Sequence, residues 1–345
     1  MTRGRTVGGK ICTMRALVVL LLLWSASAAA DVIKLRFATV APDGTGWARE
    51  MRAMSRDVAQ HTNGAVELKW YFGGIAGDEE AVMAHIAKGQ LEGAASGAIC
   101  MRLAPSLRVF RVPGLFGNWG EALFVLGQLR PRLGPEFERS GFVSLGEGGF
   151  GNDIVFSRDP VTTLAELQRG RFAFWSIDDV LRAALPVLGM HGVPMFVADA
   201  YRAFEQREID GIISMPSPAL AFQWSNVARY YTDLPLAFMP ACLIVSHGAF
   251  DALSIEQQQV LRAAGTKFQL RINDLGQEQD RRLIGELFAR QGLKRLPPSA
   301  QLRSQFLDLA RRARDQLPEE LIPRALISTV MRWLADYRDE YRASN

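Results

Sequence analysis

Residue types that commonly perform catalysis or hold metals are dispersed along this chain of 345 residues. His61, His85, His191 and His247 lie far apart, and none has a second histidine or a cysteine at the spacing of a metal site. The sequence contains neither a Gly-x-Ser-x-Gly nucleophile elbow nor a Walker phosphate-binding loop. These absences argue against an enzyme, and they predict no metal and no cofactor.

One glycine-rich segment, Gly146–Gly151, has the letters of a Gly-x-Gly-x-x-Gly nucleotide loop. Such a loop opens a helix and is followed by an acidic residue about 20 positions later. Here the strand-like residues Ile154–Phe156 follow instead. We therefore expect no dinucleotide site, and we predict that the segment joins two strands and serves as the first hinge, because glycine has the backbone freedom that a hinge needs.

Residues 1–30 have the composition of a cleaved signal peptide. Four basic residues accompany a short apolar run, Ala16–Trp24, and small residues follow it up to Ala30. The apolar run is shorter than the ~20 residues that cross a bilayer. Without residues 1–30 the chain loses four of its 40 basic residues and none of its 36 acidic ones, so its charges balance. A protein with this balance has no electrostatic footprint for nucleic acid.

Two cysteines, Cys100 and Cys242, remain after residues 1–30 are removed. An oxidising compartment outside the cytoplasm would allow them to form a disulfide. Both lie in apolar, strand-like surroundings, which favours buried free thiols. The sequence leaves both possibilities open, and we predict free thiols.

Strand-like and helix-like segments alternate from Val32 onward, which predicts an α/β fold. Two amphipathic segments near the end, Arg303–Leu317 and Ile327–Arg342, have helical spacing. We expect these helices to pack on the rest of the protein and to brace a hinge.

The segment Asp159–Trp175 resembles the signature of TRAP-transporter periplasmic solute-binding receptors, the DctP-like family. Thr62–Gly64, Val112–Gly117 and Ile209–Gly211 resemble further family motifs, and all occur in the expected order. The resemblance covers nearly all of residues 31–290. It implies a two-lobed periplasmic binding protein fold with hinge-crossing strands, C-terminal helices and a ligand cleft between the lobes.

The resemblance also implies a division of the chain. We expect a signal peptide, the first part of lobe I, lobe II, a return to lobe I, and C-terminal helices packed on the lobes. The corresponding ranges are residues 1–30, 31–151, 152–240, 241–275 and 276–345.

The residues that hold a ligand carboxylate in this family are absent here. The family's clamping arginine falls on Ala173, a second arginine on Asn152, and a further polar position on Ser214. Large apolar residues lie near these positions. The complete set of predicted ligand-binding residues is Trp47, Asn152, Arg171, Ala173, Trp175, Met195, Phe196, Ser214, Met215, Trp224 and Phe238.

These residues predict a receptor for a hydrophobic or neutral small molecule, because an unpaired carboxylate in an apolar pocket costs several kcal/mol. The implied partners are the small and large membrane subunits of a TRAP-type importer. One alternative is a carboxylate receptor that uses Arg171, which shares a strand face with Ala173. Another is a lipid-handling receptor that works with a periplasmic partner protein, such as a helical-repeat protein.

Overall fold

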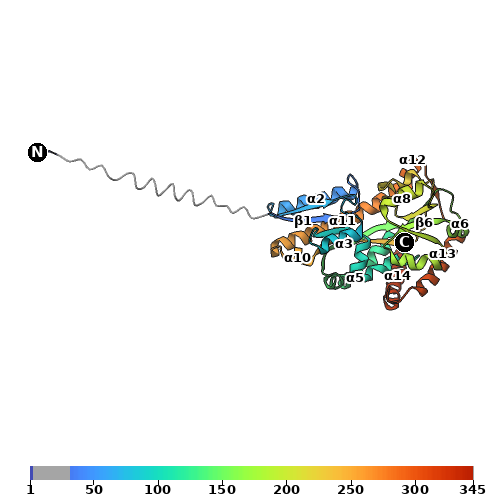
Figure 1. The fold of residues 1–345 in the computed structure, drawn as a ribbon. Helices are drawn as coiled ribbons and strands as arrows, with labels where there is room; N and C mark the ends of the chain where they lie inside the picture. Colours follow the sequence, from blue (N-terminus) through green and yellow to red (C-terminus); the bar gives the residue numbers. More distant parts are fainter. Residues whose placement is uncertain (3–31, 345) are drawn as a thin grey trace.

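The computed structural model describes residues 1–2 and 32–344. The predicted signal peptide therefore lies outside the described residues, apart from its first two. The described strands and helices form two α/β lobes side by side, as predicted (Figure 1). In this part of the chain we find no helix that combines the length and the apolar character needed to cross a membrane.

Lobe I contains a five-stranded sheet in the order β2-β1-β3-β10-β4. β1 runs parallel to β2 and β3, whereas β10 runs antiparallel to β3 and β4. Its strands are β1 (Ile33–Ala38), β2 (Val66–Tyr71), β3 (Gly93–Ser96), β4 (Phe142–Asn152) and β10 (Phe238–Ser246). Its helices are α2 (Gly46–His61), α3 (Glu79–Ala87), α4 (Ala98–Leu103), η1 (Pro105–Arg111), α5 (Trp119–Arg139), α10 (His247–Asp251) and α11 (Ile255–Arg282).

Lobe II contains a six-stranded sheet in the order β11-β9-β5-β8-β6-β7. β6 runs parallel to both β7 and β8, so the carboxyl ends of these three strands meet at one edge. The strands are β5 (Ile154–Ser157), β6 (Arg171–Trp175), β7 (His191–Met195), β8 (Gly211–Ser214), β9 (Tyr230–Thr232) and β11 (Lys294–Leu296). The helices are α6 (Leu164–Arg169), α7 (Asp179–Val187), α8 (Val197–Glu205), α9 (Pro216–Ala221), η2 (Trp224–Asn226), η3 (Leu283–Leu287) and α12 (Phe288–Arg290).

The described chain crosses between the two sheets three times, and two of these crossings are paired segments. Asp153 separates β4 from β5, and Leu236 and Ala237 precede β10. The Asp153 amide donates to the Ala237 carbonyl at 2.8 Å, and the Leu236 amide donates to the Asp153 carbonyl at 2.9 Å. These two crossings are thus hydrogen-bonded to each other, and the third crossing runs from β10 through α11 to β11.

The prediction of a glycine-rich join at Gly146–Gly151 is wrong, because the whole segment belongs to β4 and pairs with β10. These glycines let α11 approach the sheet closely. A Cβ on Gly148 would lie 1.7 Å from Gln269 Nε2 and 2.3 Å from Asn273 Oδ1, both on α11. The absence of side chains thus serves helix packing along this strand.

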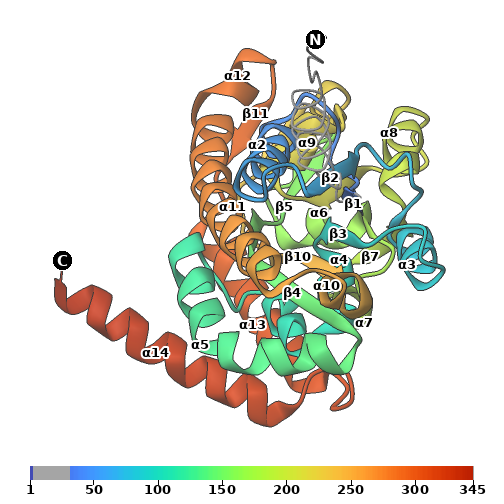
Figure 2. The same ribbon diagram turned by 90° about the vertical axis from the view of Figure 1, so that its left-hand side faces the viewer.

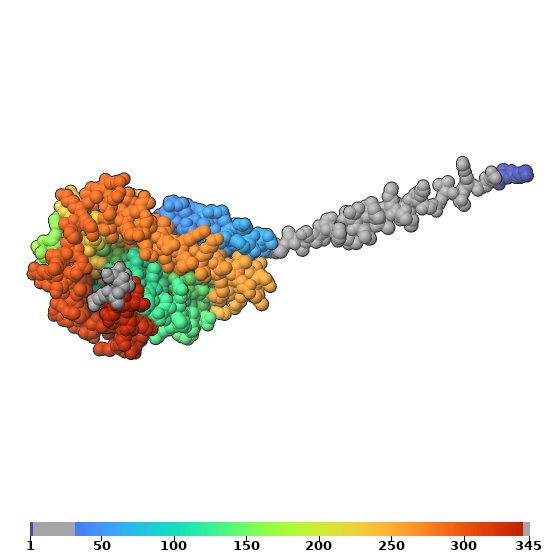
Figure 3. All heavy atoms as spheres, turned by 180° about the vertical axis from the view of Figure 1, so that it is seen from behind, coloured from blue at the N-terminus to red at the C-terminus, as the bar shows by residue number. Residues whose placement is uncertain are grey.

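The C-terminal segments form helices, as predicted. α11 is continuous past residue 275, where a boundary between lobe I and the C-terminal helices was expected (Figure 2). α13 (Ala300–Gln316) contacts α6 and α7 of lobe II, and α14 (Arg324–Ser344) contacts α5 and η1 near lobe I. Seen from behind, the orange-to-red part of the chain covers a large share of the surface (Figure 3).

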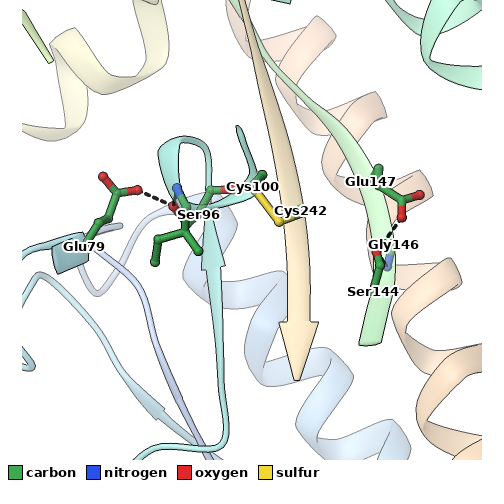
Figure 4. The surroundings of a disulfide bond; sticks show 8 residues. Glu79, Ser96, Cys100, Ser144, Gly146, Glu147 and Cys242 are labelled. Carbon is green, nitrogen blue, oxygen red and sulfur yellow. Dashed lines mark hydrogen bonds between the residues drawn. A yellow bond between two sulfur atoms is a disulfide. The ribbon is translucent and has the colours of Figure 1, made fainter. Parts of the chain in front are cut away.

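The cysteine prediction is also wrong. Cys100 on α4 and Cys242 on β10 form a disulfide, with their Cα atoms 5.7 Å apart (Figure 4). The register brings this about, because Cys242 is paired with Ser96 at the end of β3 and α4 begins two residues later. Apolar surroundings and a disulfide are therefore compatible here, since both cysteines are fully buried.

Candidate functional site

A cavity lies between the lobes at the carboxyl ends of parallel strands from both sheets. Residues after β1 and β3 line it from lobe I, and the ends of β6, β7 and β8 line it from lobe II. The cavity encloses about 780 Å³ of empty space, its open mouth included. Ligands of α/β proteins are generally bound at such strand ends.

Most of the predicted site residues meet around this cavity. The structure places eight of them in its wall, namely Trp47, Ala173, Trp175, Met195, Phe196, Ser214, Met215 and Trp224. Aromatic and methionine side chains thus form much of the lining, which suits a mostly apolar ligand.

Local structure fixes two tryptophans of the cavity wall, one from each lobe. Thr45 caps α2, with its hydroxyl accepting from the Ala48 amide, and so sets the position of Trp47 in the first turn. The Trp47 ring then packs against Phe150 of β4, with centroids 5.6 Å apart. In lobe II the Trp224 ring stacks on Phe222 with centroids 5.2 Å apart.

Three predicted residues do not line the cavity. Phe238 packs in the core beside Trp119, with ring centroids 5.2 Å apart. Asn152 ends β4, where its Oδ1 is buried and has no hydrogen-bond partner among the described residues. The third residue is Arg171.

Arg171 lies at the opposite end of β6 from the cavity, so its assignment as the clamp for a carboxylate is not supported by its position. Its exposed side chain forms an ion pair with Asp210, at 3.2 Å, and also donates to the Arg207 carbonyl. Residues two apart on a strand share a face, but they also lie about 7 Å apart along it. That distance separates Arg171 from the cavity that Ala173 lines.

Sequence reasoning missed Arg111, which ends η1 and contributes to the cavity wall. Its side chain is buried between two carboxylates. Arg111 Nε donates to Asp178 Oδ2 at 2.6 Å, and Arg111 Nη2 donates to Asp153 Oδ2 at 2.5 Å. The remaining nitrogen, Nη1, is buried and has no partner among the described residues. Trp224 Nε1 is a second buried donor without a partner there.

The three charges of this cluster influence one another. Burial raises the pKa of the Asp153 carboxyl, against the opposing effect of Arg111, and the nearby Asp178 adds to the rise. Burial works to lower the pKa of Arg111, but the two carboxylates outweigh it and raise that pKa. The guanidinium is therefore charged, and its charge is already matched by acidic partners.

The sequence did contain a signal for Arg111. It is a single charge in the apolar run Val109–Val112, and a buried charge is expensive unless it is paired. The partners of Arg111 are two acids at the ends of buried elements. Asp153 lies between two strands, and Asp178 caps α7 by accepting from the Leu181 amide at 3.0 Å.

A further acid lies directly behind the wall of the cavity. Ser96 lines the cavity at the end of β3, and its hydroxyl donates to the buried Glu79 carboxyl (Figure 4). Burial raises the pKa of Glu79 to about 7, against the effect of this hydrogen bond. Among the ionisable groups described in and behind the cavity wall, Asp153, Asp178 and Glu79 thus accompany the single base Arg111.

Comparison with known proteins places this arrangement in a family. The model of bacterial extracellular solute-binding protein family 7, DctP, matches residues 37–319. The chain belongs to this family. The resemblance to TRAP-transporter solute receptors is thereby confirmed, and the family consists of solute-binding receptors and not of enzymes.

Among curated proteins, a 2,3-diketo-L-gulonate-binding periplasmic protein of Escherichia coli is 27% identical over 206 residues. The match covers 59% of this receptor and 62% of that protein, which is less than two thirds of its length.

Two solved structures share the fold across both lobes. A TRAP periplasmic solute-binding protein of Chromohalobacter salexigens, with bound D-glucuronate, has a TM-score of 0.79 at 19% identity. That match covers 87% of this receptor and 99% of the other chain. A sugar-acid-binding protein of Advenella mimigardefordensis, in complex with galactonate, has a TM-score of 0.81 at 19% identity, covering 88% and 98%.

Proposed function

We propose that this receptor binds a largely apolar or neutral small molecule between its lobes in the periplasm. It then delivers this ligand to the small and large membrane subunits of a TRAP-type transporter. Both lobes line the cavity, so a ligand that contacts both favours the closed arrangement of the lobes over the open one.

The observation that carries the proposal is the charge of the cavity wall. Among the described residues that line it, only Arg111 and Asp153 are charged, and they pair with each other. Ala173 contributes only a methyl group to the lining. A ligand carboxylate would enter an apolar space without a free cation, which costs several kcal/mol.

A second candidate is a sugar acid, because the solved structures of similar fold contain D-glucuronate and galactonate. In that case Arg111 Nη1 would be the group to meet the acid, since Arg171 lies outside the cavity. Replacing Arg171→Gln tests the Arg171 alternative. We expect ligand affinity and melting temperature to stay close to wild type, whereas loss of binding would restore Arg171 as the clamp.

The apolar lining also suits lipid handling with a periplasmic partner protein, such as a helical-repeat protein. Pull-downs with the purified receptor from solubilised membranes and from a periplasmic extract separate the two delivery routes. Recovery of importer subunits from solubilised membranes supports the proposal, and recovery of an envelope protein alone supports the lipid-handling alternative.

The ligand itself is best identified by native mass spectrometry of the purified receptor, followed by organic extraction of any bound molecule. We expect a co-purifying apolar or neutral molecule. A sugar acid in the extract would overturn the proposal and favour the second candidate.

A further inference from the structure

We propose that the ligand carries an uncharged oxygen acceptor on its apolar body, and that Arg111 of lobe I and Trp224 of lobe II are the donors that the cavity offers to it. This inference rests on the proposed function and specifies its ligand class. Ketones, esters and amides belong to the class, whereas carboxylates do not.

Two buried donors of the cavity residues have no acceptor among the described residues. Arg111 Nη1 and Trp224 Nε1 are buried, and neither has a hydrogen-bond partner among the described residues. Both residues line the same cavity, one from η1 of lobe I and one from η2 of lobe II. A buried donor without a partner is costly, by about 1–3 kcal/mol. A ligand oxygen that accepts from either donor removes that cost only when the lobes have enclosed the ligand.

The acids around Arg111 compensate its positive charge. With Asp153 and Asp178 ionised, the cluster carries one positive and two negative charges. If Asp153 is protonated, the cluster is neutral. In both states the cluster has no net positive charge that would attract an anion. The free Nη1 is therefore a donor inside a cluster that offers no net attraction to a carboxylate, and a neutral oxygen suits it better.

The hydrogen bonds of the Arg111 guanidinium also fix the direction of its free donor. Its Nε and Nη2 are held at 2.6 Å and 2.5 Å by acids from separate elements, Asp178 at the start of α7 and Asp153 at the lobe crossing. Two such bonds fix the plane of the group, which leaves Nη1 at a fixed position. A donor positioned in this way selects for an acceptor at one place on the ligand.

Matched probes test the inference on the mature full-length receptor. Octanamide and methyl octanoate carry a neutral oxygen, octanoate carries a charge on a similar chain, and D-glucuronate represents sugar acids. Binding is measured by isothermal titration calorimetry at neutral pH. We expect both neutral probes to bind at least about tenfold more tightly than octanoate, because burying an unpaired charge costs more than that difference.

Substitutions at the acids should reverse this preference. Asp153→Asn keeps an acceptor for Arg111 Nη2 but removes one negative charge, so the ratio of octanoate to octanamide affinity should rise about tenfold. Asp178→Asn provides a second variant with the same expected direction, since asparagine also caps helices well. An unchanged ratio in folded samples of both variants overturns the charge argument.

Trp224→Phe removes only the indole donor and keeps an aromatic ring. We expect it to weaken octanamide binding about three- to tenfold, the value of one hydrogen bond. Phe222→Leu is the matched control, because Phe222 lines the same cavity and stacks on Trp224 but carries no donor. Equal losses in both variants would mean that ring packing, and not the donor, sets affinity.

The outcomes distinguish the inference from the proposed function. If octanoate binds as tightly as the neutral probes, the inference fails while the apolar cavity stands. If none of the three apolar probes binds and D-glucuronate does, the proposed function fails and the inference fails with it.

Discussion

At the scale of single residues, the position of one arginine decides how the cavity treats charge. Arg111 lies between Asp153 and Asp178 and is almost completely buried. Such a cluster contributes little net stability, but removing its cation would leave two buried acids without compensation. The arrangement is therefore a means of holding a donor in place and not a source of binding energy for anions.

Two other buried carboxyls give the receptor a pH dependence. Burial raises the pKa of Glu79 and of Asp280 to about 7, against hydrogen bonds from Ser96 to Glu79 and from Trp119 and Ser217 to Asp280. In the unfolded chain, both carboxyls lose their protons at about pH 4. The folded state thus binds more protons between about pH 4 and pH 7, so the stability that these groups confer falls as pH rises through that window.

We expect Asp280→Asn to remove part of this loss. Relative to wild type, the variant should gain roughly 2–4 kcal/mol in the free energy of unfolding on going from about pH 5 to about pH 8. Urea unfolding at the two pH values measures the difference. Asp43→Asn is the control, because Arg52 lowers the pKa of the exposed Asp43 and the gain should not appear there. A flat difference for Asp280→Asn would mean that its carboxyl is ionised in the folded protein.

The sequence indicates which residues lie close together where these residues end neighbouring parallel strands. Trp175, Met195 and Ser214 end parallel strands, so one edge of a sheet brings them together. The role of Arg111 depends on acids 42 and 67 positions away. Those contacts follow from the way the lobes pack, which local patterns do not encode.

At the scale of elements, capping residues mark where helices begin, whereas the glycines of Gly146–Gly151 do not mark a join between strands. Ser254 forms a capping box with Gln257 at the start of α11. The same signal places α6, which Thr163 caps with Glu166. Glycine permits both freedom and close packing, so its letters alone cannot separate a hinge from a strand under a helix.

The packing role of the β4 glycines is directly testable. We expect Gly148→Ala to lower the free energy of unfolding by about 1–3 kcal/mol, because its methyl group would overlap Gln269 and Asn273 on α11. Chemical unfolding measures the change. Gly127→Ala on α5 is the matched control, since nothing lies within 4 Å of its Cβ, and it should be neutral or stabilising by up to about 1 kcal/mol. Equal effects at both sites would contradict the close-packing explanation.

At the scale of the whole molecule, the disulfide formed by the described cysteines lies within lobe I. Cys100 and Cys242 are 142 positions apart, so the bond closes a long loop of the unfolded chain. Replacing both with alanine should lower the free energy of unfolding by about 2–5 kcal/mol.

Chemical unfolding with and without dithiothreitol measures this effect. Reductant should shift the wild-type transition towards that of the double variant and leave the variant unchanged. An equal effect of reductant on both proteins would show that the disulfide is not the cause.

The paired crossing at Asp153 constrains how the lobes can move. Two backbone hydrogen bonds join Asp153 to Leu236 and Ala237, so neither connecting segment can swivel alone without breaking them. Together they form a short hydrogen-bonded pair of segments, which we expect to deform by twisting along its length. The helix α11, which continues into η3 of lobe II, is a third connection, and we expect opening and closing to follow a single rotational coordinate. Spin-label distances measured between several pairs of sites on the two lobes should therefore all vary as functions of one angle.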